Sequence, residues 1–91
     1  MQIKFFGTLY LELKRGEIEL KLDQPKSIKN LLQDLSSQLG PQFHRKLFQN
    51  HQLRQGVIIL KNGANILHLQ GLDTVIKDED TLAIFPPGGG G

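Results

Sequence analysis

Ala83-Ile84-Phe85-Pro86-Pro87-Gly88-Gly89-Gly90-Gly91 is the stretch from which we predict the rest of the fold. Residues 81–85 form a short apolar run with a β-branched and an aromatic residue, which predicts a buried strand. The two prolines end that strand because neither has a backbone N–H to donate to a neighbouring strand. The four glycines lack a Cβ and therefore adopt many conformations. We predict a domain over residues 1–87 and a flexible glycine tail over residues 88–91.

The tail has two interpretations. A glycine-rich end is often only a disordered segment or a flexible linker. Alternatively, the six residues from Pro86 to Gly91 reach about 20 Å when fully extended, which is enough to enter the active site of another protein. The residues that precede the tail decide between the two.

The composition of the chain predicts one small domain. It has 91 residues, 38% of them apolar, and a net charge of +2. The basic residues are spread from Lys4 to Lys77, which argues against a nucleic-acid-binding surface. No window resembles a transmembrane helix, and the first residues lack the pattern of a signal peptide, so we expect no membrane association and a cytoplasmic location.

Cysteine is absent from the sequence, which limits the chemistry of the side chains. Without a thiol, the chain forms no disulfide, thiolate metal site, persulfide or cysteine nucleophile. His44, His51 and His68 match no ligand spacing that we recognise, so we expect no metal site. The sequence also contains no acid–base or nucleophilic constellation typical of a catalyst.

The first part of the chain predicts a hairpin. Apolar residues recur through residues 2–13 with an imperfect period of two, which predicts a strand that is kinked at Gly7. Residues 14–16 form a turn, and residues 17–22 alternate with Ile18, Leu20 and Leu22 toward the core.

The middle of the chain predicts one main helix. Ser27 is a helix cap, and Gly40-Pro41 is a typical helix end. Between them the apolar residues share one helical face, and they are Ile28, Leu31, Leu32, Leu35 and Leu39. Residues 42–55 predict a second short helix followed by a loop.

The last third of the chain predicts three strands. Val57 to Leu60 are continuously apolar, which predicts a central strand with both faces covered. Asn62-Gly63 is a turn signal before a short strand at residues 66–69. Residues 71–74 form a loop, and residues 78–80 form a polar turn into the final strand.

This order of elements predicts an α+β fold of the ubiquitin-like β-grasp type. We expect a mixed sheet of four to five strands with one main helix packed across it. Because a helix that links strands of one sheet favours a right-handed, parallel crossover, the first and last strands lie side by side. The tail then projects from the end of the sheet.

The same residues resemble the MoaD/ThiS family of small sulfur carriers, which includes the small subunit of molybdopterin synthase. The resemblance rests on Asn62-Gly63, on residues 71–74, and on residues 78–87 followed by Gly90-Gly91. Two positions differ from the family pattern. Glu79 stands where a glycine is usual, and Gly88-Gly89 stand where an apolar and a small residue are usual.

The resemblance implies a chemistry at the C-terminus. An adenylating, E1-like enzyme uses ATP to form an acyl-adenylate on Gly91, which follows Gly90, and a sulfur donor system replaces AMP to leave a thiocarboxylate. The chain then serves as a non-catalytic subunit with a synthase large subunit in molybdopterin biosynthesis, and binds no cofactor itself. Three alternatives stay open. The first is sulfur delivery for thiamine or transfer-RNA thiolation, and the second is ubiquitin-like modification of lysines through Gly91. The third is a β-grasp binding module whose glycines are only a linker, which predicts no acyl chemistry.

The resemblance also implies a partner-binding surface where the tail leaves the domain. Phe6 and Phe85 are the expected partner-facing aromatic residues, although both also fit the role of ordinary core residues. The segment from Pro86 and Pro87 through Gly88 and Gly89 completes the expected surface.

Overall fold

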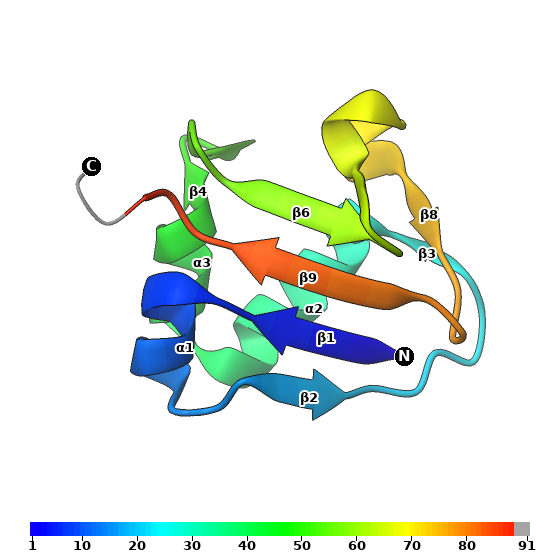
Figure 1. Ribbon diagram of the computed structural model, residues 1–91, viewed down its shortest axis with the longest axis horizontal. Coiled ribbons are helices and arrows are strands. Elements are labelled where there is room, and N and C mark those ends of the chain that lie inside the picture. Colours follow the sequence, from blue (N-terminus) through cyan, green and yellow to red (C-terminus); the bar gives the residue numbers. More distant parts are fainter. Residues whose placement is uncertain (89–91) are drawn as a thin grey trace.

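Five strands form one mixed sheet in the computed structural model, which describes residues 1–88 (Figure 1). Across the sheet they are β2 (Glu17–Glu19), β1 (Gln2–Phe5), β9 (Thr81–Phe85), β6 (Ile58–Lys61) and β7 (Ala64–Asn65). β1 and β9 are parallel, with Ile3 beside Leu82, and every other neighbouring pair is antiparallel. The predicted placement of the first and last strands side by side is therefore confirmed, as is the α+β, β-grasp fold.

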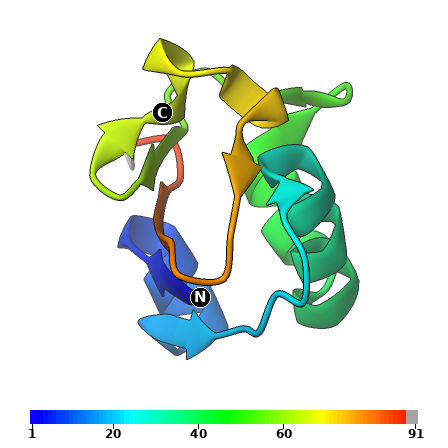
Figure 2. The same ribbon diagram turned by 90° about the vertical axis from the view of Figure 1, so that its right-hand side faces the viewer.

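Helices cover one face of this sheet, as Figure 2 shows from the side. α2 (Ile28–Leu39) is the main helix, and Ser27 caps it as predicted, because the Ser27 hydroxyl accepts a hydrogen bond from the Asn30 N–H at 3.1 Å. Gly40 ends the helix with a φ of 103°. Pro41 is then the first residue of the next helix, α3 (Pro41–Leu47). Proline suits this first helical position since its missing N–H has no partner there in any helix.

The core lies between α2, α3 and the covered face of the sheet. Alternate residues of β1 and β9 point into it, and the predicted stripe of α2 packs against them. The fully buried side chains of these three elements are Ile3, Phe5, Leu82, Ile84, Ile28, Leu31, Leu32 and Leu35. Phe43 and Leu47 of α3 close one end of the core, which confirms the predicted second helix.

The predicted strand over residues 2–13 is wrong beyond Phe5. Gly7 takes a φ of 60°, which ends β1 and starts α1 (Gly7–Leu13). Leu9 then reaches the core from the helix, whereas Leu11 is 69% exposed. The pairing of the first two strands is nevertheless antiparallel as predicted, with α1 inserted between them.

Two further predictions are corrected near β6. The strand is interior to the sheet, but only one face is covered, since Ile59 is buried while Ile58 is 42% exposed. Asn62 and Gly63 form the predicted turn, both with positive φ, and β7 follows it directly. Residues 66–69 are therefore not a strand but mainly the 3₁₀ helix η1 (Ile66–His68), which the Asn65 side chain caps.

Short elements complete the molecule. β4 (Phe48–Gln49) and β5 (Gln52–Leu53) form a small hairpin after α3, and η2 (Gly71–Asp73) occupies the predicted loop. β3 (Lys26–Ser27) pairs with β8 (Val75–Ile76), a pairing that the sequence did not reveal. Among residues 1–88, no helix has the length and apolar composition needed to cross a bilayer.

Candidate functional site

The aromatic pair Phe6 and Phe85 marks the end of the sheet from which the tail departs. The Phe6 N–H donates to the Ile84 carbonyl at 3.1 Å, which extends the β1–β9 ladder by one residue. Since side chains alternate along a strand, Phe6 and Phe85 both point away from α2, α3 and the core. Their rings stack with centroids 4.4 Å apart and an angle of 9° between their planes.

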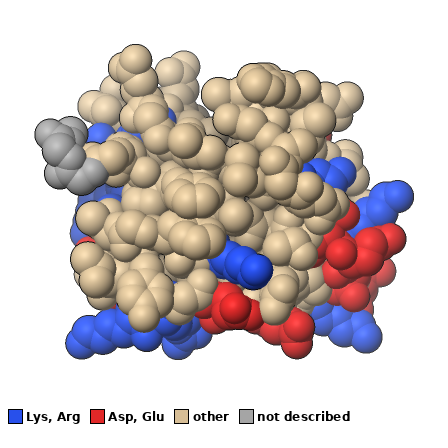
Figure 3. Space-filling model, in the orientation of Figure 1, with Lys and Arg blue, Asp and Glu red and all other residues tan. Residues whose placement is uncertain are grey.

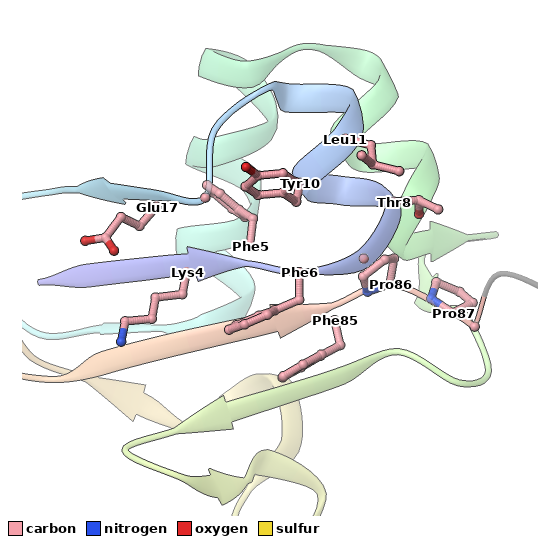
Figure 4. Close-up of a pocket in the computed structure, with 13 residues that line it drawn as sticks. Lys4, Phe5, Phe6, Thr8, Tyr10, Leu11, Glu17, Phe85, Pro86 and Pro87 are labelled. Carbon is pink, nitrogen blue, oxygen red and sulfur yellow. The ribbon is translucent and has the colours of Figure 1, made fainter.

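These aromatic residues belong to a groove of about 860 Å³ between α1 and the end of β9 (Figure 4). Thr8, Tyr10 and Leu11 contribute from α1, while Phe6 and Phe85 contribute from the sheet. Tyr10 is 50% exposed and Leu11 is 69% exposed, so this wall presents apolar surface to solvent. Exposed aromatic and aliphatic side chains that gather in one place are typical of a protein-binding surface.

The open face of the sheet extends the apolar surface beyond the groove. Ile58 of β6 lies directly beside Phe85 in the strand register, and Leu60 lies beside Ala83. Figure 3 shows that this face is mostly uncharged, with one basic side chain near its centre, side chains of both signs along its lower edge and acidic side chains at its right-hand edge. A large surface with few charges at its centre resembles the core of a protein interface more than an ordinary solvated surface.

The titratable side chains of the groove are few. Among the described residues that line it, they are Lys4, Glu17 and Tyr10. Glu17 accepts a hydrogen bond from the Gln2 side-chain amide at 2.7 Å. Lys4 and Glu17 lie opposite each other in the β1–β2 register, which is a common place for an amine and a carboxylate on a sheet surface. The rest of the described lining is mainly apolar, which suits the groove to binding.

Two carboxylates with shifted pKa values lie at the opposite end of β9. The backbone N–H of Leu22 and the N-terminal ammonium group hold the pKa of Asp78 below its usual value. Burial opposes ionisation of Asp80, but hydrogen bonds from the Asn62 side chain and the Lys77 N–H outweigh it and lower the pKa of Asp80. Both carboxylates fix the turn that leads into β9, far along the strand from the groove.

The structure brings together every predicted site residue that it describes. Phe6, Phe85, Pro86, Pro87 and Gly88 all line the one groove, and neither aromatic residue belongs to the buried core. Gly89, Gly90 and Gly91, which carry the predicted carrier chemistry, lie outside the described residues. Of His, Cys, Asp and Glu, residues 1–88 contain no group of three close enough to bind a metal ion.

The sequence interpretation missed the α1 wall of the groove. The strand predicted over residues 2–13 separates the side chains of Thr8, Tyr10 and Leu11. On the helix α1 these side chains instead line the same groove. The sequence does contain a signal of this helix. The apolar alternation is interrupted at Gly7, and beyond it Leu9 and Leu13 have the i, i+4 spacing of a helix.

Comparison with known proteins gives a family match over almost the whole chain. The family model described as the ThiS family matches residues 3–91. The small archaeal modifier protein 3 of Haloferax volcanii is 28% identical over 91 residues, which span 100% of this chain and 98% of that protein.

Solved structures agree with the fold. The small archaeal modifier protein 1 of Methanosarcina acetivorans is 30% identical, with a TM-score of 0.82 over 99% of this chain and 94% of that one. A putative molybdopterin converting factor, subunit 1, from Pyrococcus furiosus gives a TM-score of 0.71 over 96% of this chain and 95% of that one. Its identity is 21%, so this second likeness shows the fold alone.

Proposed function

Because the chain belongs to the ThiS family, we propose that it is a sulfur carrier whose reactive group is the carboxylate of Gly91. The family and its relatives make it a small ubiquitin-like carrier or modifier rather than a catalyst. The observation that carries the proposal is the exit of the chain from β9. There the strand delivers Pro86, Pro87 and Gly88 to the rim of an apolar groove.

The chemistry starts from an unreactive group. A carboxylate is a poor electrophile, so its oxygen first attacks the α-phosphate of ATP, which releases pyrophosphate and forms an acyl-adenylate. Hydrosulfide supplied by a sulfur donor system then attacks the acyl carbon, forms a C–S bond and expels AMP, which leaves a thiocarboxylate on Gly91. The chain has no cysteine to carry the sulfur itself. Both steps therefore belong to partner enzymes, and ATP is bound by the adenylating enzyme.

The partner that consumes the sulfur is, in our proposal, the large subunit of a molybdopterin synthase. The support for this assignment is the resemblance of residues 78–87 and of Gly90-Gly91 to the small sulfur carriers. The site of action proposed for all these steps is the cytoplasm.

A second function is favoured by the names of two relatives. Both are small archaeal modifier proteins, and one of them is 30% identical to this chain. A modifier uses the same activated carboxylate, but a lysine amine replaces AMP and forms an isopeptide bond. Sulfur delivery for thiamine or transfer-RNA thiolation uses the same first two steps.

The body of the domain supplies the affinity in either case. Phe6 and Phe85 form a stacked pair, with Tyr10 in the same groove and Ile58 beside Phe85 in the strand register. Aromatic anchors of this kind commonly dominate the energy of an interface. The partners of the proposal dock on this face while the tail enters their active sites.

An exchange assay tests the activation step. The purified chain, an adenylating enzyme from the same organism, ATP and labelled pyrophosphate are combined, and label in ATP is counted. We expect exchange with the chain that ends at Gly91 and none with a chain extended by one alanine. Exchange with the extended chain, or none with either, would contradict activation at this carboxylate.

A further inference from the structure

The chain leaves the domain along a gradient of burial. Pro86 is buried, Pro87 is half-buried and Gly88 is exposed. Two consecutive prolines already restrict the backbone, because each ring fixes its own φ. Burial of the first ring adds a contact that fixes the pair relative to the sheet. Pro86 therefore packs against the domain, and the chain separates from the domain only at Pro87 and Gly88.

Two glycines hold the prolines from either side. Gly7 follows β1, and Gly56 precedes β6, and these two strands are the neighbours of β9 in the sheet. A Cβ built on Gly7 would lie 3.4 Å from Cγ and 3.5 Å from Cδ of Pro86. A Cβ built on Gly56 would lie 3.6 Å from Cα and 3.7 Å from Cβ of Pro87.

Both glycines also have a backbone conformation that favours glycine. The φ of Gly7 is 60° and that of Gly56 is 94°. With no side chain at either position, bare backbone forms the surface on which the proline rings rest. A Cβ at either position would lie at ordinary van der Waals contact distance from the prolines, and only the atoms beyond the Cβ of a larger side chain would compete for the space beside the rings.

We propose that Gly7 and Gly56 are positioning residues that aim the tail. They form a cradle for Pro86 and Pro87, and the cradle fixes the direction in which Gly88 leaves the body. The inference rests on the proposed function. In that function the carboxylate must reach a partner's active site while the body is docked, so the direction in which the tail leaves the body matters. A cradle restricts the directions of the tail before binding, so less conformational entropy is lost when the body docks.

The chain offers matched controls for both glycines. Gly71 has a φ of 58° and, like Gly7, is the first residue of a short helix. Gly63 has a φ of 86°, close to the φ of Gly56. A Cβ on either control would meet nothing within 4 Å.

Asparagine is the substitution of choice because it tolerates positive φ better than other residues with a side chain. The chain itself holds Asn50 and Asn62 at φ values of 53° and 50°. Gly7→Asn and Gly71→Asn thus carry similar backbone strain, and differ in the contact with Pro86. Gly56→Asn and Gly63→Asn form the second pair.

The first readout is nuclear magnetic resonance of the free chain, which does not depend on the proposed function. In the wild type we expect nuclear Overhauser contacts from the Gly7 Hα to the Pro86 ring and from the Gly56 Hα to Pro87. We also expect the heteronuclear Overhauser effect of the Gly88 amide to fall in Gly7→Asn and Gly56→Asn, and to stay at the wild-type value in both controls.

The second readout is steady-state adenylation by the partner enzyme. We expect kcat to fall about 10- to 100-fold in Gly7→Asn and Gly56→Asn, as for a misplaced reacting group. KM for the chain stays within about twofold in Gly56→Asn, because Gly56 does not line the groove. Gly7 itself lines the groove, so for Gly7→Asn the kcat and the Gly88 amide are the readouts. Both controls keep the wild-type kcat.

Each outcome decides the proposal. Equal losses of kcat in a cradle variant and its control would show a general effect of backbone strain and overturn it, as would absence of the wild-type Overhauser contacts. A cradle variant that fails to fold leaves the other pair and the wild-type contacts to decide. If the wild type is not adenylated at all, the proposed function fails. The heteronuclear Overhauser effect of the Gly88 amide then tests the cradle by itself.

Discussion

At the scale of single residues, the stacked rings of Phe6 and Phe85 are the most specific feature of the exposed surface. Neither ring is needed to fill the core, since both face away from α2 and α3. Phe6 is 38% exposed although its ring stacks on that of Phe85, so the pair presents apolar aromatic surface to solvent. The pair therefore carries the first prediction.

Phe85→Ala should weaken binding to the synthase large subunit, or to the adenylating enzyme, by about 2 kcal/mol or more, within the range of interface hot spots. The loss arises because the variant removes one ring from the interface and leaves Phe6 unsupported. Isothermal titration measures it. Leu67→Ala is the control, because Leu67 is 69% exposed but lies on η1, outside the groove. Equal losses in both variants would contradict the assignment of the groove.

Asp80 gives a second prediction, about stability rather than binding. It is buried in the turn before β9, and it accepts hydrogen bonds from Asn62 at 2.8 Å and from the Lys77 N–H at 2.7 Å. Asp80→Ala leaves both donors without this acceptor, which should lower the free energy of unfolding by about 1–3 kcal/mol. Glu79→Ala at the exposed neighbouring position should change it by less than about 0.5 kcal/mol.

The pH dependence of stability follows from the same carboxylate. The pKa of Asp80 in the folded chain lies below its ordinary value of 3.8, so the charged form is the one that folding stabilises. The contribution of Asp80 is complete above the ordinary pKa and is lost as pH falls through the folded pKa. Urea titrations from pH 6 to about pH 2 should show a shallower acid decline in Asp80→Ala than in the wild type. Parallel declines would show that Asp80 is not linked to folding in this way.

At the scale of elements, α2 provides most of the cover over the sheet. Leu35→Ala should cost about 2–5 kcal/mol, because Leu35 is fully buried and its truncation leaves a cavity. Gln33→Ala on the exposed face of the same helix is the control, with an expected change below about 0.5 kcal/mol. Chemical denaturation compares the two. A cost for Leu35→Ala well below 1 kcal/mol would mean that the helix is not packed as described.

The elements also show what the sequence could predict. α2 was predictable because its apolar stripe, the Ser27 cap and the Gly40 end all agree. β9 was predictable because the prolines stop it. The parallel pairing of β1 with β9 followed from topology. Local pattern and global fold support one another in these elements.

Other elements were not predictable because their stability comes from tertiary contacts. α1 is seven residues long and is anchored by Leu9 in the core, so its apolar pattern is too short to tell helix from strand. The two-residue strands β3 and β8 pair across about fifty residues of sequence, for which local sequence carries no signal. The exposure of one face of β6 was not predictable either. A continuous apolar run does not show whether both faces of a strand are covered within the same chain, and in β6 only the face of Ile59 is buried.

At the scale of the whole molecule, the proposed function places affinity and reactivity in different parts of the chain. The described body presents the apolar face, whereas the proposed reactive carboxylate is that of Gly91. Ordering a backbone residue costs about 1–2 kcal/mol, and Gly88 and Gly89 have no side chains to bury in return. Deleting residues 88–91 should therefore weaken partner binding much less than Phe85→Ala, while it abolishes adenylation. Titration calorimetry compares the two variants, and a larger loss from the deletion would identify the tail as the anchor.

The most direct test of the central claim is the intact mass of the chain purified from its own cells. We predict a fraction with a mass gain equal to the replacement of one oxygen by sulfur, located by fragmentation to Gly91. The gain should disappear when the adenylating enzyme is deleted. Tryptic peptides with a Gly90-Gly91 branch on lysines of other proteins, without any sulfur-bearing chain, would instead support the modifier function. A chain that shows neither the mass gain nor such branches would contradict activation at Gly91.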